Sequence, residues 1–229
     1  KPADGENADT AIYVLSRVAG EGADRNAAKG DYYLKDDEHQ MLSDLCAYYK
    51  NVIVAVNAGG QVDLSFMDEF ANIKALLVIV QPGMEGGNAF ADVISGKVNP
   101  SGKLVDSWAY KYEDYPSAAT FSHNNGNVEK ELYEEGIYVG YRYFDTFNVP
   151  VRYGFGYGLS YTTFAFENEK IELVRKNNNN NDKIRTTVSV KNTGSVAGKE
   201  VVQVYASLPG GVMEKEAHRL VAYGKTELL

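Results

Sequence analysis

The sequence predicts an α/β domain with an open, mostly parallel sheet flanked by helices, followed by an incomplete antiparallel β-sandwich. Near-continuous aliphatic runs at 10–16, 51–58 and 75–81 are typical of parallel strands that are buried on both faces. Helices are expected to separate these runs. From residue 164 onward apolar and polar residues alternate with period two, which indicates antiparallel strands.

The helices of the first part follow from apolar spacing and from capping residues. DDEHQMLSDLCAYYK places its apolar residues at helical spacing, and Asp37 with Gln40 indicates an N-cap and its reciprocal partner. GGNAFADVISG predicts a shorter helix that ends before Gly96. Strands and helices that alternate in this way predict an open sheet with helices on both faces.

The second part contains four candidate strands, in FAFENEKIELV, IRTTVSVKNTG, KEVVQVYASLP and RLVAYGKTELL. A β-sandwich of this type has about seven strands, so this domain is expected to be truncated. Before it, residues 111–148 lack regular alternation, and a connection of this length is usually functional or docked on another surface. We therefore predict two domains, residues 1–158 and 159–229.

Composition limits the class of function. The chain has 23 basic and 31 acidic residues, a net charge of -8 and no polybasic run, so we expect neither nucleic acid nor a membrane as a partner. A neutral or cationic ligand fits better. No apolar stretch approaches the roughly 20 residues of a membrane helix, and KPADGENADT lacks the basic-then-apolar layout of a signal peptide. We therefore expect a soluble chain, either cytoplasmic or secreted.

Neither cofactor nor metal is expected. The single cysteine, Cys46, lies in a helical pattern and forms neither an internal disulfide nor a thiolate cluster. The three histidines, His39, His123 and His218, show no metal-ligand spacing. A strand followed by Gly-x-Gly suggests a dinucleotide site, but Arg25 stands where the third glycine belongs and Glu21 would repel a pyrophosphate.

Glu21 is the candidate for chemistry. It stands between two glycines in AGEGADR, which leaves the carboxyl end of the first aliphatic run, where open α/β sheets bind ligands. The residues alone also permit a solvated loop carboxylate at this position. The flanking glycines argue mildly against that reading, because they permit unusual dihedral angles. Asp24 and Arg25 are expected to support the loop, as an ion pair or as a backbone clamp.

Several motifs together resemble the C-terminal half of family 3 glycoside hydrolases of the β-glucosidase type. They are AGEGADR, KGDYYLKDDE, VNAGG, VQPGMEGGNAFADVISGKVNPSGKL, LYEEGIYVGYRYFDTF and YGFGYGLSYTTF, in this order. The resemblance covers essentially the whole chain. The final segment KNTGSVAGKEVVQVY resembles the fibronectin type III-like domain of these enzymes.

The resemblance implies a retaining O-glycosyl hydrolase that acts on terminal β-linked sugars of oligosaccharides or β-glucosides. It implies that Glu21 is the general acid/base and that an aspartate nucleophile lies on a TIM-like barrel of the same protein. Nothing in the sequence resembles that barrel, so we expect a fragment that is inactive alone. The chain has Ala19 and Ala23 where relatives often have serine and an aromatic residue, and the second change is expected to alter the cleft wall.

Other residues and other functions stay open at this point. In YEEGIYVGYRYFD, the residues expected to line the cleft or to organise the interface with the barrel are Tyr133, Glu134, Tyr141 and Arg142. Glu134 is the second candidate for a catalytic carboxylate. A non-catalytic carbohydrate-binding or adhesion module is the alternative function. A purely structural interaction module is a third reading.

Overall fold

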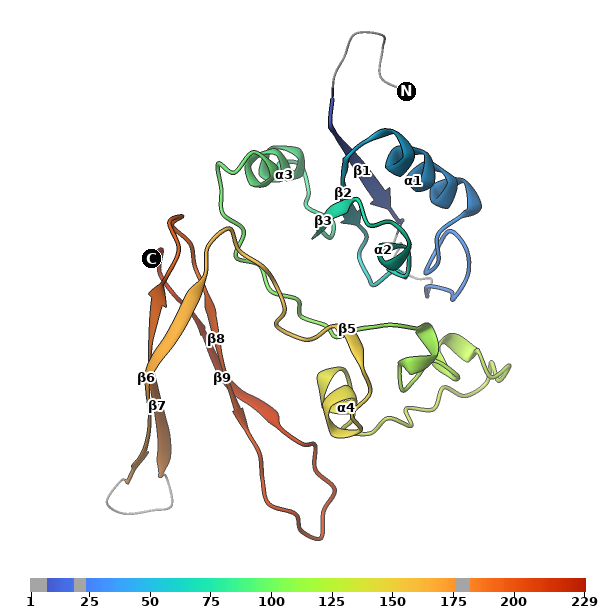
Figure 1. The fold of residues 1–229 in the computed structure, drawn as a ribbon. Coiled ribbons are helices and arrows are strands. Elements are labelled where there is room, and N and C mark those ends of the chain that lie inside the picture. Colours follow the sequence, from blue (N-terminus) through green and yellow to red (C-terminus); the bar gives the residue numbers. More distant parts are fainter. Residues whose placement is uncertain (1–7, 19–23, 176–181) are drawn as a thin grey trace. The chain divides into compact units, whose positions relative to one another are not determined.

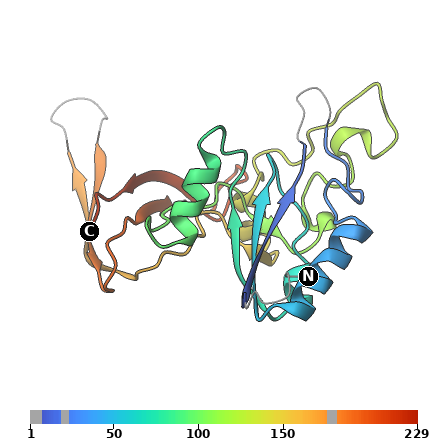
Figure 2. The ribbon, with the colours of Figure 1, turned by 90° about the horizontal axis from the view of Figure 1, so that it is seen from above.

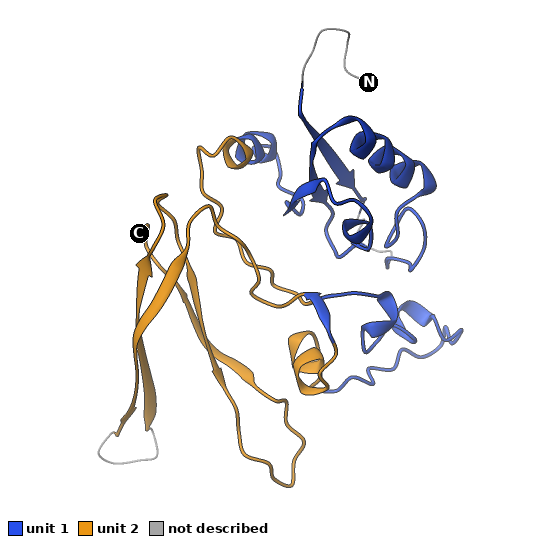
Figure 3. Ribbon diagram, viewed as in Figure 1, with its two compact units in different colours: residues 1–91, 108–136, 150–152 blue, residues 92–107, 137–149, 153–229 orange. Residues whose placement is uncertain are grey.

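The structure, a computed structural model, describes residues 8–18, 24–175 and 182–229, and Figure 1 shows the course of the chain. It divides into two compact units, coloured in Figure 3. Unit 1 takes residues from 1–91, 108–136 and 150–152, and unit 2 takes residues from 92–107, 137–149 and 153–229. The chain passes between the units more than once, and the domain boundary after residue 158 stays a prediction.

A parallel sheet of three strands forms the core of unit 1, as the aliphatic runs predict. Its order is β1 (Thr10–Ser16), β2 (Asn51–Asn57) and β3 (Ile73–Val78). The central strand β2 carries the most deeply buried side chains, because it has a neighbour on each side. Val52, Val54, Ala55 and Val56 are fully buried there. The β-branched residues suit this position, since they pack well on a pleated surface.

Strand β1 differs from β2 because it lies at the edge of this sheet. Its register with β2 runs without interruption from Thr10 opposite Asn51 to Ser16 opposite Asn57. Leu15 is fully buried, but the side chains of Ile12 and Val14 are 46% and 49% exposed. The aliphatic pattern of β1 therefore includes residues that solvent reaches in this structure.

Helix α1 (Asp36–Tyr48) connects β1 to β2 and buries Leu42 completely. The predicted N-cap at Asp37 is wrong, because the helix begins one residue before it. The backbone N–H of Lys35 instead donates to Oε2 of Glu38 at 2.8 Å. Glu38 thus has the reciprocal role that the sequence pattern assigned to Gln40, whose side chain bonds to Asp44 within the helix at 2.9 Å.

Two further helices follow the strands. The short helix α2 (Phe66–Glu69) lies between β2 and β3 and buries Phe66. The alternating order predicts a helix at this place in the chain, but no helical pattern indicated its residues. Helix α3 (Gly86–Ile94) follows β3 as predicted, and Gly96 after its end has the positive φ of 77° that ends many helices. Figure 2 shows α1 on one side of the three strands and the first turns of α3 on the other.

The irregular segment from Lys111 to Asn148 contains only short elements. They are 3₁₀ turns at Tyr112–Asp114 and Phe121–His123 and the helix α4 (Tyr141–Thr146). Strands β4 (Trp108–Ala109) and β5 (Val151–Tyr153) flank this segment and pair with each other. Regular structure is therefore sparse here, as the sequence predicts.

Unit 2 contains the antiparallel strands. β6 (Phe164–Val174) pairs with β7 (Lys183–Asn192), and β8 (Val201–Ala206) pairs with β9 (Arg219–Lys225). All four match the predicted segments to within a few residues. In the part of the chain that the structure describes, no helix is long and apolar enough to cross a membrane.

Candidate functional site

Glu21, the predicted acid/base, lies outside the described residues, as do its neighbours from 19 to 23. The structure describes both ends of its segment. Strand β1 ends at Ser16, and Arg17 follows it directly. On the other side the description resumes at Asp24, which is exposed, and at Arg25, which is half-buried. Arg17 and Arg25 are the two arginines nearest to this segment in the sequence.

Arg17 holds the first end of the segment. Its side chain is only 3% exposed and forms a two-point ion pair with Glu38 of α1, with both N–O distances at 2.7 Å. The same guanidinium donates from Nε to the carbonyl oxygen of Asp31 at 2.8 Å and from Nη1 to that of Ser16 at 2.8 Å. A planar guanidinium suits this site because its donors point in fixed directions.

Arg25 holds the second end. Its Nε donates to Oδ1 of Asp31 at 2.6 Å, and its Nη2 donates to the carbonyl oxygen of the same residue at 2.8 Å. Nη1 donates to the carbonyl oxygen of Gln61, which follows β2, at 2.5 Å. Gly60 leaves room for this arm, since a Cβ placed there would lie 2.9 Å from Nη1. Arg25 thus clamps the backbone around Asp31 and Gln61.

The carboxyls of Asp31 and Glu38 both have pKa values below their ordinary range. Partial burial acts to raise each pKa, but hydrogen bonds outweigh it. For Asp31 these bonds come from the backbone N–H of Asn26 and from Arg25, and for Glu38 they come from Arg17 and the N–H of Lys35. The ionised forms of both carboxyls are therefore favoured in the folded protein.

These shifts predict a loss of stability in acid. The pKa values of both carboxyls are lower in the folded protein than in the unfolded one. Their contribution to the free energy of unfolding is therefore complete above about pH 5, and it is lost as the pH falls below about 4. Urea unfolding at pH 7, 5 and 3.5 measures this, and an Asp31→Asn, Glu38→Gln double variant serves as the control. We expect a shallower decline in the control. An equal decline of the free energy of unfolding in both proteins would mean that Asp31 and Glu38 do not cause the loss of stability in acid.

A pocket of about 730 Å³ opens at the carboxyl ends of the three parallel strands, within unit 1. Arg17 lies on its wall, so the segment that contains Glu21 begins beside it. The other lining residues are Val14, Ser16, Val18, Asn57, Ile79, Gln81, Pro82, Gly83, Gly86, Gly87 and Phe90. This is the edge of an open α/β sheet at which ligands usually bind.

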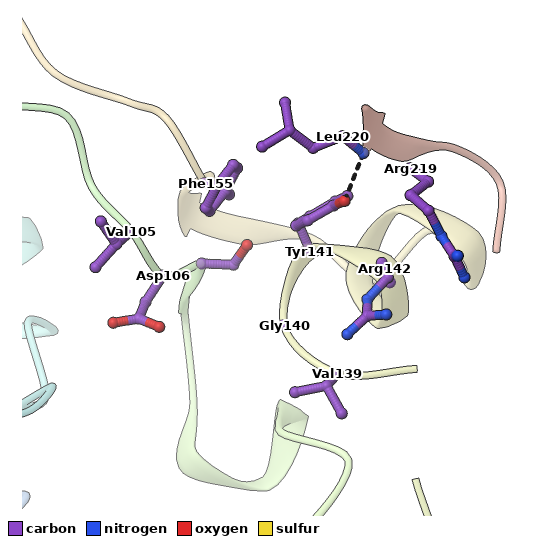
Figure 4. Close-up of a pocket in the computed structure, with 10 residues that line it drawn as sticks. Val105, Asp106, Val139, Gly140, Tyr141, Arg142, Phe155, Arg219 and Leu220 are labelled. Carbon is purple, nitrogen blue, oxygen red and sulfur yellow. Dashed lines mark hydrogen bonds between the residues drawn. The ribbon is translucent and has the colours of Figure 1, made fainter. Parts of the chain in front are cut away.

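The remaining predicted site residues lie in the segment between β4 and β5. Tyr133 is 84% exposed, and Glu134 next to it is also exposed in a turn of unit 1. Arg142 lies on α4 in unit 2, where it lines a pocket of about 510 Å³ (Figure 4). Their roles in a cleft or at an interface stay predictions.

Tyr141 organises the pocket beside Arg142. Its hydroxyl accepts a hydrogen bond from the backbone N–H of Leu220 at 2.8 Å, drawn as a dashed line in Figure 4. Its ring stacks on that of Phe155, with the ring centroids 5.0 Å apart, and on that of His218 at 5.9 Å. These contacts join α4 to the start of β9, which indicates a structural role for the tyrosine.

The sequence predicts a supporting role for Arg25 but names none of its hydrogen-bond partners. Arg17, Asp31 and Glu38 were absent from the predicted site, although Asp31 bonds to both Arg17 and Arg25 and Glu38 pairs with Arg17. One signal for Arg17 was available, because a charged residue directly after a buried strand needs a partner. Asp31 and Glu38 gave no such signal, since they come close to Arg17 only through the turn between β1 and α1.

Across residues 8–18, 24–175 and 182–229, no group of three or more His, Cys, Asp or Glu side chains could hold a metal ion.

Comparison with known proteins gives relatives that are named β-glucosidases. A β-glucosidase A from Butyrivibrio fibrisolvens is 41% identical over 97% of this chain and 30% of its own length. A β-glucosidase from Ruminococcus albus is 42% identical over 98% of this chain and 22% of its own length. The chain thus spans less than a third of the length of these relatives.

The solved structures that resemble this chain are also structures of β-glucosidases. β-Glucosidase 3B from Thermotoga neapolitana, determined in complex with glucose, has a TM-score of 0.88 at 41% identity and matches 96% of this chain and 30% of its own. A β-glucosidase from Paenibacillus barengoltzii has a TM-score of 0.89 at 42% identity, over 96% of this chain and 24% of its own. The predicted fold class is therefore confirmed.

The family follows from the match to a conserved domain. Residues 2–141, which are more than half of the chain, match the glycosyl hydrolase family 3 C-terminal domain. The relatives and solved structures extend the similarity beyond this range. The chain therefore belongs to glycosyl hydrolase family 3, as the sequence motifs indicated, and corresponds to a C-terminal portion of its β-glucosidases.

Proposed function

We propose that this chain is the acid/base-bearing portion of a retaining β-glucosidase, which hydrolyses terminal β-linked sugars. The observation that carries the proposal is the similarity of nearly the whole chain to proteins named β-glucosidases. The position of Glu21 in the motif AGEGADR, directly after β1, supports its assignment as the acid/base. A TIM-like barrel of the same protein supplies the nucleophilic aspartate, and residues 159–229 belong to a fibronectin type III-like domain.

The chemistry needs two carboxyl groups roughly 5 to 5.5 Å apart. In the first step the aspartate attacks the anomeric carbon, the bond to the leaving oxygen breaks, and Glu21 gives its proton to that oxygen. In the second step the carboxylate of Glu21 takes a proton from water. The water oxygen then attacks the anomeric carbon and displaces the aspartate. Glu21 is thus acid in one step and base in the other.

The other predicted residues support this centre. Arg25, four residues after Glu21 in the sequence, bonds to Asp31 and to the carbonyl oxygen of Gln61. Asp24 supports the same segment. Tyr133, Glu134 and Arg142 line the sugar cleft or contact the barrel. This arrangement leaves catalysis to Glu21 and the aspartate of the barrel.

The alternative is a carbohydrate-binding or adhesion module without catalysis. Calorimetry with glucose and cellobiose separates the two functions, because half of an active site should not hold a sugar tightly while a binding module should. We expect no measurable heat of binding for the chain alone. We expect hydrolysis of 4-nitrophenyl β-glucoside only when the chain is part of the whole protein, meaning together with the barrel.

Two other outcomes would contradict the proposal. Saturable sugar binding by the chain alone, with no hydrolysis by the whole protein, would establish the binding module. Absence of both would establish a structural interaction module. A preparation of the whole protein with the nucleophilic aspartate replaced by asparagine serves as the control for contaminating glucosidases.

A further inference from the structure

Asn125 and Gly126 form the single Asn-Gly pair of the sequence. They lie in unit 1, just after the 3₁₀ turn Phe121–His123, and every residue from 123 to 130 is exposed. In such a pair the backbone nitrogen of the glycine can attack the side-chain amide of the asparagine, because the glycine has no Cβ to obstruct the approach. Water, the other reactant, reaches this turn freely.

The turn around this pair is closed by hydrogen bonds and carries backbone strain. The backbone N–H of Gly126 donates to the carbonyl oxygen of His123 at 2.8 Å, and Nδ1 of His123 donates to that of Asn127 at 2.8 Å. Ser122 and His123 have positive φ angles of 53° and 61°, which are costly for residues with a Cβ. Because the turn is exposed, water can replace His123 as the partner of the Gly126 nitrogen when that nitrogen reacts.

The side chain of Asn125 is held through its oxygen. Oδ1 accepts a hydrogen bond from the backbone N–H of Asn127 at 2.9 Å. A bond of this kind turns the asparagine side chain toward the backbone that follows it, which includes the nitrogen of Gly126. It also places a donor at the oxygen that becomes negative when a nucleophile adds to the amide carbon. A fixed N–H at such an oxygen stabilises the charge, as in the oxyanion hole of an enzyme.

Asn124, the preceding residue, lacks both features. Its side chain is held through its nitrogen, since Nδ2 donates to the carbonyl oxygen of Ala118 at 3.1 Å and to the hydroxyl of Tyr112 at 3.3 Å. The residue that follows it is Asn125, whose Cβ obstructs an attack by the backbone nitrogen. Asn124 is therefore expected to be stable.

Asn127 has one feature but lacks the other. Its Oδ1 accepts from the backbone N–H of Glu129 at 3.0 Å, which is the same bond that Asn125 makes. The residue that follows it, however, is the β-branched Val128. Of these three asparagines, Asn125 alone combines a bonded amide oxygen with a following glycine.

We propose that Asn125 is a site of spontaneous deamidation. The nitrogen of Gly126 loses its proton and attacks Cγ of Asn125. A new C–N bond forms, and the side-chain nitrogen takes up a proton and leaves as ammonia. Water then adds to the cyclic imide and opens it at either carbonyl. The product is an aspartate or an isoaspartate, in which the main chain runs through the side-chain carbon.

The reaction changes the turn in two ways. It adds a negative charge near Glu131, which already pairs with His123 at 3.2 Å. Where isoaspartate forms, an extra methylene group enters the main chain before Gly126. The bond from the N–H of Gly126 to the oxygen of His123 then loses its present geometry, and we expect a protease to cut the turn faster.

The test uses the whole protein, incubated at pH 8 and at pH 6 in water enriched in heavy oxygen. Trypsin cleaves after Lys111 and Lys130, and mass spectrometry of residues 112–130 gives the extent of reaction at each asparagine. We expect Asn125 to deamidate about tenfold or more faster than Asn124 and Asn127. Each product should carry one heavy oxygen, and the rate should be higher at pH 8, because the attacking nitrogen must lose a proton.

Asn127→Pro tests the donor to the amide oxygen. Proline has no backbone N–H, so the rate at Asn125 should fall by about tenfold, less than the loss in a buried oxyanion hole because water replaces the donor. Asn127→Ala is the matched control, since it keeps the N–H, and it should leave the rate nearly unchanged. Equal slowing in the two variants would remove the role of the donor.

Gly126→Ala tests the attacking nitrogen in a second way. Its Cβ lies in the path of the attack, so deamidation should slow here too. Melting temperatures of all variants are measured beside the rates. Equal rates at the three asparagines of the unaltered protein, or products without heavy oxygen, would overturn the proposal without any variant.

Discussion

Glu21→Gln in the whole protein is expected to lower kcat/KM for an alkyl β-glucoside by about 10³-fold, because general acid catalysis typically contributes 10² to 10⁴. Glu134→Gln, the comparison variant, is expected to lower it far less. Glutamine keeps the size of the side chain and removes the transferable proton, so the comparison isolates proton transfer. Initial rates of glucose release give the measurement.

Azide provides an independent reading of the same residue. In Glu21→Ala no base activates the water of the second step, but azide is a nucleophile that needs no base. We expect azide to restore turnover of 2,4-dinitrophenyl β-glucoside and to give a glucosyl azide product. Equal losses in the Glu21 and Glu134 variants, or no response to azide, would refute the assignment of the acid/base.

Arg17→Met is expected to lower the free energy of unfolding by about 3 to 5 kcal/mol, the typical cost of breaking a buried ion pair by removing one partner. The side chains of Arg17 and Glu38 are 3% and 17% exposed, so Glu38 would stay partly buried without its partner. Urea unfolding followed by circular dichroism at pH 7 measures the change.

Lys50→Met is the control for this experiment. Its ion pair with Asp9 lies at the surface, with side chains 76% and 64% exposed, and such pairs contribute less than about 1 kcal/mol. A loss in Arg17→Met no larger than that in Lys50→Met would mean that the guanidinium network does not stabilise unit 1.

The sequence predicted the regular elements well where their pattern is long. The three parallel strands were found because aliphatic residues run almost without interruption, and the four strands of unit 2 because their alternation lasts for several residues. Helix α1 was found, but not its first residue, because Asp36, Asp37 and Glu38 are all acidic and suit several positions at the start of a helix. Helix α2 has only four residues, too few for a helical period to show.

The site was predicted less completely, for a different reason. A motif identifies a residue by its neighbours in the sequence, and in this way AGEGADR pointed to Glu21 and Arg25. The bonds from Arg17 to Asp31 and Glu38 span 14 and 21 residues and exist only once β1, the turn and α1 have packed. Such contacts depend on tertiary structure, which local patterns do not contain.

Among the described residues β1 pairs on one side only, with β2, and this edge has a practical consequence for experiments on the isolated chain. Ile12 and Val14 add half-exposed aliphatic surface to a row of backbone groups that can pair with another strand. Two copies brought together at high concentration have a template there for self-association. Calorimetry on the isolated chain therefore needs light scattering as a check for aggregates, because the heat of aggregation can be mistaken for the heat of ligand binding.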